Sequence, residues 1–273
     1  MARHPVAAFL AIGYAVYLGA ALVPSPIDTA FMPFDLPLHA SLGTILGVGL
    51  AAFLVTAAAD GRAGVDDLVR RCLRWRVPVR WYLFAILVLP VATTLIALAI
   101  YAGDASPTNG WLRAFGGVLA LLVLQFVLFN FAEEIGFTGF LQDRWQDRYG
   151  ALKLSAMVAV FWAVWHLPDH FSEEGWTLAQ LAIAPAFLVF EFVVLFFARV
   201  VMVWLYAGTG RSVLLVGLFH ASFDATITKL SKEVIPGSNG VRFLVVTGIV
   251  ILAAGAVIVT TRGRFSGGEP RSS

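Results

Sequence analysis

The chain alternates between long apolar runs and short polar segments. Apolar runs fall at about 5–24, 39–59, 81–102, 114–141, 154–168, 177–205, 212–230 and 241–261. A helix needs about 20 apolar residues to cross a hydrocarbon core of about 30 Å. Because most of these runs reach that length, the pattern predicts an all-α, polytopic membrane protein of about eight transmembrane helices.

Individual runs differ in length. The run at 5–24 is longer than the apolar core of about 7–15 residues in a signal peptide, which predicts an uncleaved first helix. The run at 154–168 is short and reaches Pro168. Since proline removes a backbone donor and disfavours further helix, we expect this helix to end there, inside the protein.

Composition supports a membrane protein. Of the 273 residues, 59% are hydrophobic and 13% are charged, which leaves too few polar side chains to cover a soluble globule of this size. Basic residues do not form a face interleaved with aromatics, so nucleic-acid binding is not indicated. The single cysteine, Cys72, excludes an internal disulfide and a cysteine-based metal site, and we interpret it as a reduced cytoplasmic thiol.

Basic residues predict the orientation of the chain in the membrane. With the N-terminus inside, fifteen of the nineteen Lys and Arg residues fall in segments assigned to the cytoplasm, which agrees with the positive-inside rule. Arg199 and Arg211 are counted there as one such segment. We therefore expect both termini in the cytoplasm and, in a bacterium, location in the plasma membrane. The arginine-rich stretch 60–80 is expected at the interface with anionic lipid.

Three polar clusters interrupt the apolar runs. They contain Glu133 with Glu134, then His166, then His220 with Asp224. An ionisable side chain at bilayer depth costs about 2.5–3.5 kcal/mol on insertion scales, so such clusters indicate function by default. At a rise of about 1.5 Å per residue, all three lie at similar depths on the cytoplasmic side of the midplane. The sequence therefore predicts one site built from three helices.

Spacing within the clusters adds detail. His220 and Asp224 are four residues apart and share a helix face. Glu133 and Glu134 point about 100° apart, so one is expected to face a cavity and the other to pack between helices. His170 follows Pro168 and is not expected to join His166 as a metal ligand. Glu191, in the middle of a long run, is interpreted as a packing or cavity-lining acid and not as a catalytic residue.

Taken in order, these motifs resemble a known family. The segment from Glu133 to Thr138, then Trp162-x-x-x-His166, then His220-x-x-x-Asp224 resemble the E-E-x-x-x-R, F-x-x-x-H and H-x-x-x-N/D motifs of the CAAX protease and bacteriocin-processing (CPBP, or Abi) family of intramembrane proteases. The resemblance covers about 115–225. Trp162 stands where the family has phenylalanine, and Thr138 where it has arginine. Threonine cannot form an ion pair with Glu134.

The resemblance implies hydrolysis of a peptide bond by a glutamate-activated water, in a cavity open to the cytoplasm. Glu133 would be the general base and Glu134 its support, His166 would position the water, and His220 with Asp224 would lie beside the oxyanion. The substrate would be a peptide or membrane protein, in contact with membrane lipid. A zinc-dependent metalloprotease using Glu133, His166 and His220 stays open, because two histidines and a carboxylate with a free position suit zinc.

The sequence divides into three parts with different expected roles. Residues 1–110 would form N-terminal transmembrane helices with a basic cytoplasmic loop, 111–230 the CPBP/Abi-like catalytic core, and 231–273 the last transmembrane helix and a disordered cytoplasmic tail. The alternative to a protease is a catalytically silent immunity or regulatory scaffold of the same fold, for which the missing arginine would be the reason. A proton-coupled transporter would use similar buried acids, but no repeat symmetry is evident in the sequence.

Overall fold

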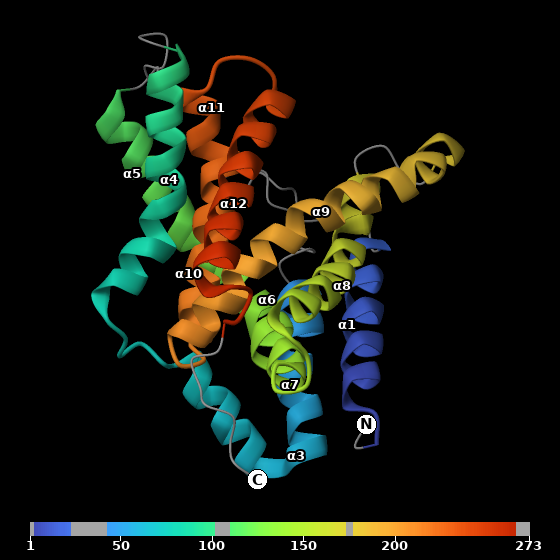
Figure 1. Cartoon of the computed structure of the whole chain (residues 1–273). Helices are drawn as coiled ribbons and strands as arrows, with labels where there is room; N and C mark the ends of the chain where they lie inside the picture. Colours follow the sequence, from blue (N-terminus) through green and yellow to red (C-terminus); the bar gives the residue numbers. More distant parts are fainter. Residues whose placement is uncertain (1–2, 23–42, 102–109, 173–176, 266–273) are drawn as a thin grey trace.

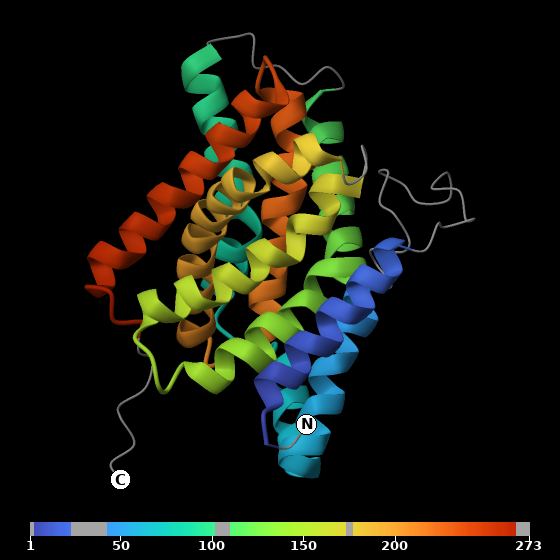
Figure 2. The same ribbon diagram turned by 90° about the vertical axis from the view of Figure 1, so that its right-hand side faces the viewer.

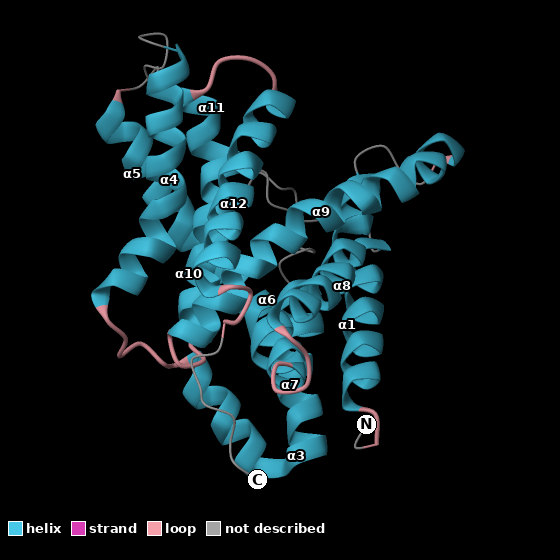
Figure 3. Ribbon diagram, in the orientation of Figure 1, coloured by secondary structure: helices cyan, strands magenta, loops and turns pink. Residues whose placement is uncertain are grey.

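The computed structural model describes residues 3–22, 43–101, 110–172 and 177–265; within these ranges it does not describe the side chains of 20–22, 168–172 and 180. Every regular element in the described ranges is a helix, as Figure 3 shows. The predicted all-α class is therefore confirmed. The tail predicted to be disordered lies mostly outside the described residues.

In the described part of the chain, eight apolar helical regions correspond to the eight predicted runs. In chain order the elements, with η marking π-helical segments, are α1 (Pro5–Leu22), η2 (Ile45–Leu50), α3 (Ala51–Cys72), α4 (Val79–Tyr101), α5 (Trp111–Gln125), η3 (Phe126–Asn130), α6 (Phe131–Glu134), η4 (Ile135–Gln142), α7 (Asp143–Trp145), α8 (Ala151–Ser172), α9 (Leu178–Gly208), α10 (Val213–Ala225), η5 (Thr226–Leu230), α11 (Ser231–Val234) and α12 (Asn239–Thr261). Among the described residues, six regions are long and apolar enough to cross a membrane, namely Ile45–Cys72, Val79–Tyr101, Trp111–Trp145, Leu181–Gly208, Val213–Val234 and Asn239–Thr261. The apolar parts of α1 and α8 are shorter.

The region that begins with α10 lies at the centre of the assembly. In Val213–Val234, 67% of the most apolar window is buried within the protein, against 17–39% for the other candidate spans. Figures 1 and 2 show α10 surrounded by the α4, α5 and α9 helices, and α1 lying beside α3 at the edge. A polar side chain on α10 is therefore directed towards protein and not towards lipid.

Two local features differ from the prediction or refine it. Helix α8 continues through Pro168 to Ser172, so the expectation that it ends at this proline is wrong. Neighbouring helices can satisfy the backbone groups that a proline frees in a membrane helix. Helix α3 continues to Cys72 but bends at Gly61, whose φ of 66° favours glycine. Part of the segment predicted at the lipid interface is therefore the second half of α3.

A polar network fastens η4 to α3 and α9. One Arg71 nitrogen donates a hydrogen bond to the Gly139 carbonyl oxygen at 2.6 Å and lies 3.1 Å from the Asp143 carboxylate. The Tyr206 hydroxyl accepts from Arg71 at 3.0 Å and donates to Asp143 at 2.9 Å. Because η4 directly follows Glu134, this network fixes the helix that carries both glutamates. The three-part division of the chain stays a prediction.

Candidate active site

Glu133 and Glu134 occupy a short α-helical turn between two π-helical segments. Helix α6 contains only Phe131–Glu134, with η3 before it and η4 after it. Each π segment changes the direction in which later side chains point, and such segments are frequent at functional sites. Both side chains are buried: Glu133 is 7% exposed and Glu134 is 0% exposed.

Glu134 is held by a buried arginine from another helix. Arg199, on α9, places Nη1 2.8 Å from Oε2 and Nη2 2.9 Å from Oε1 of Glu134, and both side chains are fully buried. The assignment of Arg199 to a cytoplasmic segment is therefore wrong, because it lies inside a helix of the bundle. Without it, fourteen basic residues remain on the side assigned to the cytoplasm and four on the other.

Thr138 completes this cluster. Its hydroxyl donates a hydrogen bond to Glu134 Oε2 and accepts one from Arg199 Nη1 at 3.0 Å. The motif has no arginine at position 138, but the guanidinium of Arg199 lies beside Thr138 and pairs with Glu134. Glu134 therefore has an ion-pair partner even though its own motif provides none.

His220 lies between the two glutamates. Its Nδ1 is 3.1 Å from Glu134 Oε1, while its Nε2 is 3.9 Å from Glu133 Oε2 and 3.7 Å from Asp224 Oδ2. The ring is 3% exposed. Two of the three predicted clusters, on α6 and α10, therefore meet at His220.

Asn130 joins the site through Asp224. Its Nδ2 donates a hydrogen bond to Asp224 Oδ2 at 2.7 Å, and the residue is 1% exposed. Sequence reasoning did not include Asn130 among the site residues. The sequence does contain a signal for it: Asn130 is a polar amide within an apolar run, four residues before Glu134 and so on the same helix face.

Trp162 links the third cluster to the other two. Its ring centroid is 4.8 Å from that of His220 and 5.7 Å from that of His166, and the Arg199 guanidinium carbon lies 4.0 Å from it. His166 Nδ1 is 3.0 Å from the Trp162 carbonyl oxygen, so Nδ1 donates, and in the neutral ring Nε2 is then an acceptor. His166 lies near enough to Glu133 for an electrostatic interaction.

Several buried polar atoms at the site make no hydrogen bond within the described protein. They are Glu133 Oε2, Asn130 Oδ1, Trp162 Nε1, Arg199 Nε and His220 Nδ1. A buried polar atom without a partner costs about 1–3 kcal/mol, so atoms of this kind are the natural contacts for water or a substrate. Glu134, by contrast, has both oxygens engaged. The two adjacent glutamates are therefore in different chemical environments.

Zinc was the alternative predicted for this cluster. Zinc ligands lie about 2.0–2.2 Å from one point. Among the described residues, no group of three His, Cys, Asp or Glu side chains is arranged to hold a metal ion. The zinc site at Glu133, His166 and His220 stays a prediction. The side chain of His170 lies outside the described residues, and Glu191 lies within α9.

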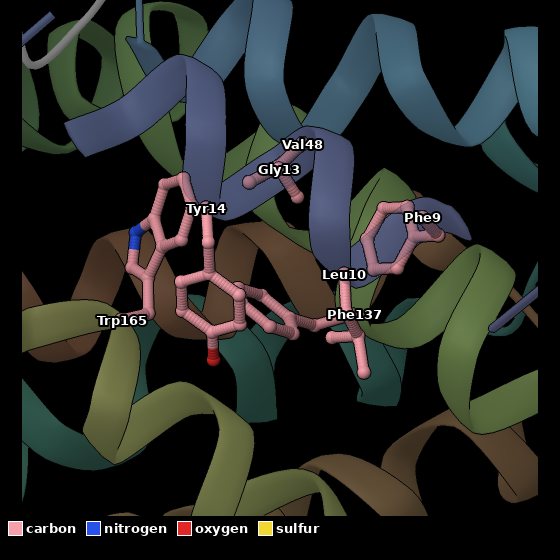
Figure 4. Close-up of a pocket in the computed structure, with 7 residues that line it drawn as sticks. All are labelled: Phe9, Leu10, Gly13, Tyr14, Val48, Phe137 and Trp165. Atoms are coloured by element: carbon pink, nitrogen blue, oxygen red, sulfur yellow. The ribbon is translucent and has the colours of Figure 1, made fainter. Parts of the chain in front are cut away.

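Two cavities lie near the site without including it. An apolar one of about 10 Å³ lies between α1, η4 and α8, where Phe9, Phe137 and Trp165 line it (Figure 4). A polar one of about 230 Å³ lies beside Gly139 and includes Arg71 and Asp143. Neither is the cavity predicted around the glutamates and histidines, so that cavity stays a prediction.

Comparison with known proteins agrees with the motifs. Residues 115–226 match the family model described as type II CAAX prenyl endopeptidase Rce1-like. The chain is also 24% identical over 151 residues to a CAAX prenyl protease 2 of Methanococcus maripaludis, a match that covers 55% of this chain and 52% of that protein. The matched region thus spans about half the length of this curated relative. The resemblance to the CAAX protease and bacteriocin-processing family is confirmed.

Proposed function

We propose that the chain is an intramembrane endopeptidase in which Glu133 activates a water molecule without a metal ion. The premise is that residues 115–226 match the Rce1-like family of CAAX endopeptidases. The observation that carries this proposal is the contrast between the glutamates. Arg199 engages both oxygens of Glu134, whereas Glu133 Oε2 has no hydrogen-bond partner and faces His220. Glu133 is therefore the carboxylate that can accept a proton.

The reaction follows from this contrast. Glu133 accepts a proton from water as the oxygen of that water attacks the peptide carbonyl carbon. The same proton passes to the leaving nitrogen when the carbon–nitrogen bond breaks. His166, whose Nε2 is an acceptor, orients the water. His220 and the Asn130 amide act beside the carbonyl oxygen, where donors held in a dry site stabilise negative charge strongly.

The polar atoms around Glu133 would face the cytoplasm in the expected orientation. Water and a peptide segment would then enter from that side, through the cavity that we expect between α6, α8 and α10. The name of the Methanococcus relative suggests a C-a-a-X peptide with a prenylated cysteine as the first substrate to test. Contact with lipid would let the prenyl chain stay in the bilayer.

A silent scaffold of the same fold is the competing function. Its main argument was the missing arginine at position 138, and Arg199 removes that argument because it supplies the ion pair to Glu134. A transporter gains no support from the described residues. Proteolysis is therefore the function to test first.

The test is cleavage of a farnesylated C-a-a-X peptide by the full chain in liposomes, with and without a zinc chelator. Glu133→Gln should lower kcat by about 10²–10⁴-fold, the range for loss of a general base. Glu233→Gln, in α11 and ion-paired with Lys229, makes the same chemical change away from the site and should leave kcat unchanged. A parallel arm compares peptide termini in membranes that contain wild-type or Glu133→Gln protein.

Either arm can support proteolysis. Undiminished cleavage by Glu133→Gln in both arms would refute the glutamate mechanism, and absence of any Glu133-dependent cleavage would favour the scaffold. Loss of activity with the chelator, restored by zinc, would refute the metal-free mechanism.

A further inference from the structure

We infer that Arg199 is a positioning residue for the proposed reaction. It fixes His220 through Glu134, and it forms the ion pair with Glu134 that an arginine at position 138 could form instead. The inference rests on the proposed function. It concerns one spatial arrangement, in which a guanidinium from α9 reaches the carboxylate on α6 and, through it, the imidazole on α10.

The burial of Arg199 requires a reason. The side chain is 0% exposed within α9, whose residues Leu181–Gly208 form a candidate membrane span. A buried ion pair often contributes little net stability, because the cost of desolvating both charges offsets their attraction. An intramembrane arginine that pairs with a carboxylate next to Glu133 is therefore more simply explained by function than by folding.

The geometry fits orientation of the carboxylate. Two guanidinium nitrogens meet the two oxygens of Glu134, so the carboxylate plane cannot rotate. Stacking on the Trp162 ring at 4.0 Å restrains the guanidinium in turn. Lysine offers one charge without this planar fork, so it could neutralise Glu134 without holding its orientation.

The consequence reaches His220. Glu134 Oε1 lies 3.1 Å from Nδ1, an ion-pair distance for a protonated ring, and Nε2 is directed towards Glu133 and Asp224. A carboxylate held in place beside one ring nitrogen restrains the orientation of the ring through charge attraction. Arg199 thus acts on the reacting end of His220 without touching it.

An arginine at position 138 could bring a guanidinium to the same place as Arg199 does. The Thr138 hydroxyl contacts both Glu134 and Arg199 Nη1, so the side chains of 138 and 199 converge on one point. Shortening residue 199 to alanine would release the space that a longer side chain at 138 could enter. An arginine moved from α9 to η4 should therefore restore the ion pair.

The experiment compares Arg199→Ala, Arg199→Lys and Thr138→Arg/Arg199→Ala in liposomes with the farnesylated C-a-a-X peptide. Arg199→Ala should lower kcat by at least about tenfold with a smaller change in KM, as for loss of an interaction that matters mainly in the transition state. Arg199→Lys should recover only part of the loss. The double variant should recover at least tenfold over Arg199→Ala. Arg62→Ala, at an arginine of α3 whose side chain is 94% exposed, is the control and should keep full activity.

The outcomes separate this inference from the proposed function. If Glu133→Gln is inactive while Arg199→Lys keeps the wild-type kcat, the inference fails and the protease mechanism stands. A double variant that unfolds at the same temperature as Arg199→Ala or higher, but is no more active, also refutes it. Should the double variant not fold, Arg199→Lys decides the question, because it keeps the charge and loses the fork.

Discussion

The indole of Trp162 meets the imidazole of His220 edge to face, with ring centroids 4.8 Å apart and ring planes at 86°. Trp162 is 1% exposed and lies on α8, whereas His220 lies on α10. An edge-to-face pair of rings contributes about 0.5–1.5 kcal/mol beyond the area it buries. Together with the Glu134 contact, this packing leaves the His220 ring little freedom to rotate.

The first prediction concerns this packing. Trp162→Phe should keep a ring against His220 and reduce kcat less than tenfold, whereas Trp162→Leu should reduce it much more. A third variant, Trp162→Ala, should lower the free energy of unfolding by about 3–5 kcal/mol, the usual cost of truncating a large buried aromatic side chain. Peptide cleavage and thermal unfolding in detergent measure the two effects. Equal activity of the Phe and Leu variants would show that the ring does not position His220.

The second prediction concerns the hydrogen bond between Asn130 and Asp224. Asn130→Asp would place two carboxylates at the 2.7 Å contact, so we expect a large loss of activity from repulsion. The exchanged pair, Asn130→Asp with Asp224→Asn, restores one amide and one carboxylate at the same contact. It should therefore be more active than Asn130→Asp alone. Additive losses in the double variant would show that the amide must come from position 130.

The third prediction concerns the packing of η4 against α1 and η2. A Cβ at Gly136 would lie 2.2 Å from a Val48 methyl carbon and 2.9 Å from the Phe9 ring. Gly136→Ala should lower stability by about 1–3 kcal/mol, the range for overpacked cores, and should reduce activity because it moves the helix that carries Glu133.

Gly248 in α12 provides the matched control. A Cβ there would meet no described heavy atom within 4 Å. Gly248→Ala should therefore be neutral, or stabilising by up to about 1 kcal/mol through helix propensity. Thermal unfolding of both variants in the same detergent makes the comparison. Equal unfolding temperatures would indicate that η4 can move away from α1 without cost.

The fourth prediction concerns orientation. Figure 1 shows α7 and the connection from α3 to α4 at one end of the molecule, and α11 with the start of α5 at the other. The first end carries most of the basic residues outside the helix interiors, so it should face the cytoplasm. A reporter fused after Ser273 should be active in the cytoplasm, and one inserted at Glu174 should be active outside. The reverse pattern would show that the protein has the opposite orientation in the membrane, with the site reached from the other side.

The sequence by itself determined the helical, membrane-spanning class. Hydropathy is a property of consecutive residues, so the eight apolar runs could be identified directly from the sequence. Six of the corresponding helices, as far as the chain is described, have spanning length. The order and spacing of Glu133, His166 and His220 were enough to identify the family that the comparison confirmed. Likewise, the adjacency of the glutamates was enough to predict that they would differ in environment.

Only the tertiary structure decided which groups became partners. Arg199 and Glu134 are separated by 65 positions, and no local pattern distinguishes a buried ion-pair arginine from one at a helix end. The prediction for Arg199 failed for that reason. The same limit hid Asn130, whose role depends on Asp224 being brought beside it by α10. Helix length and lipid exposure follow from local composition, whereas the pairing of buried charges follows from how the helices pack.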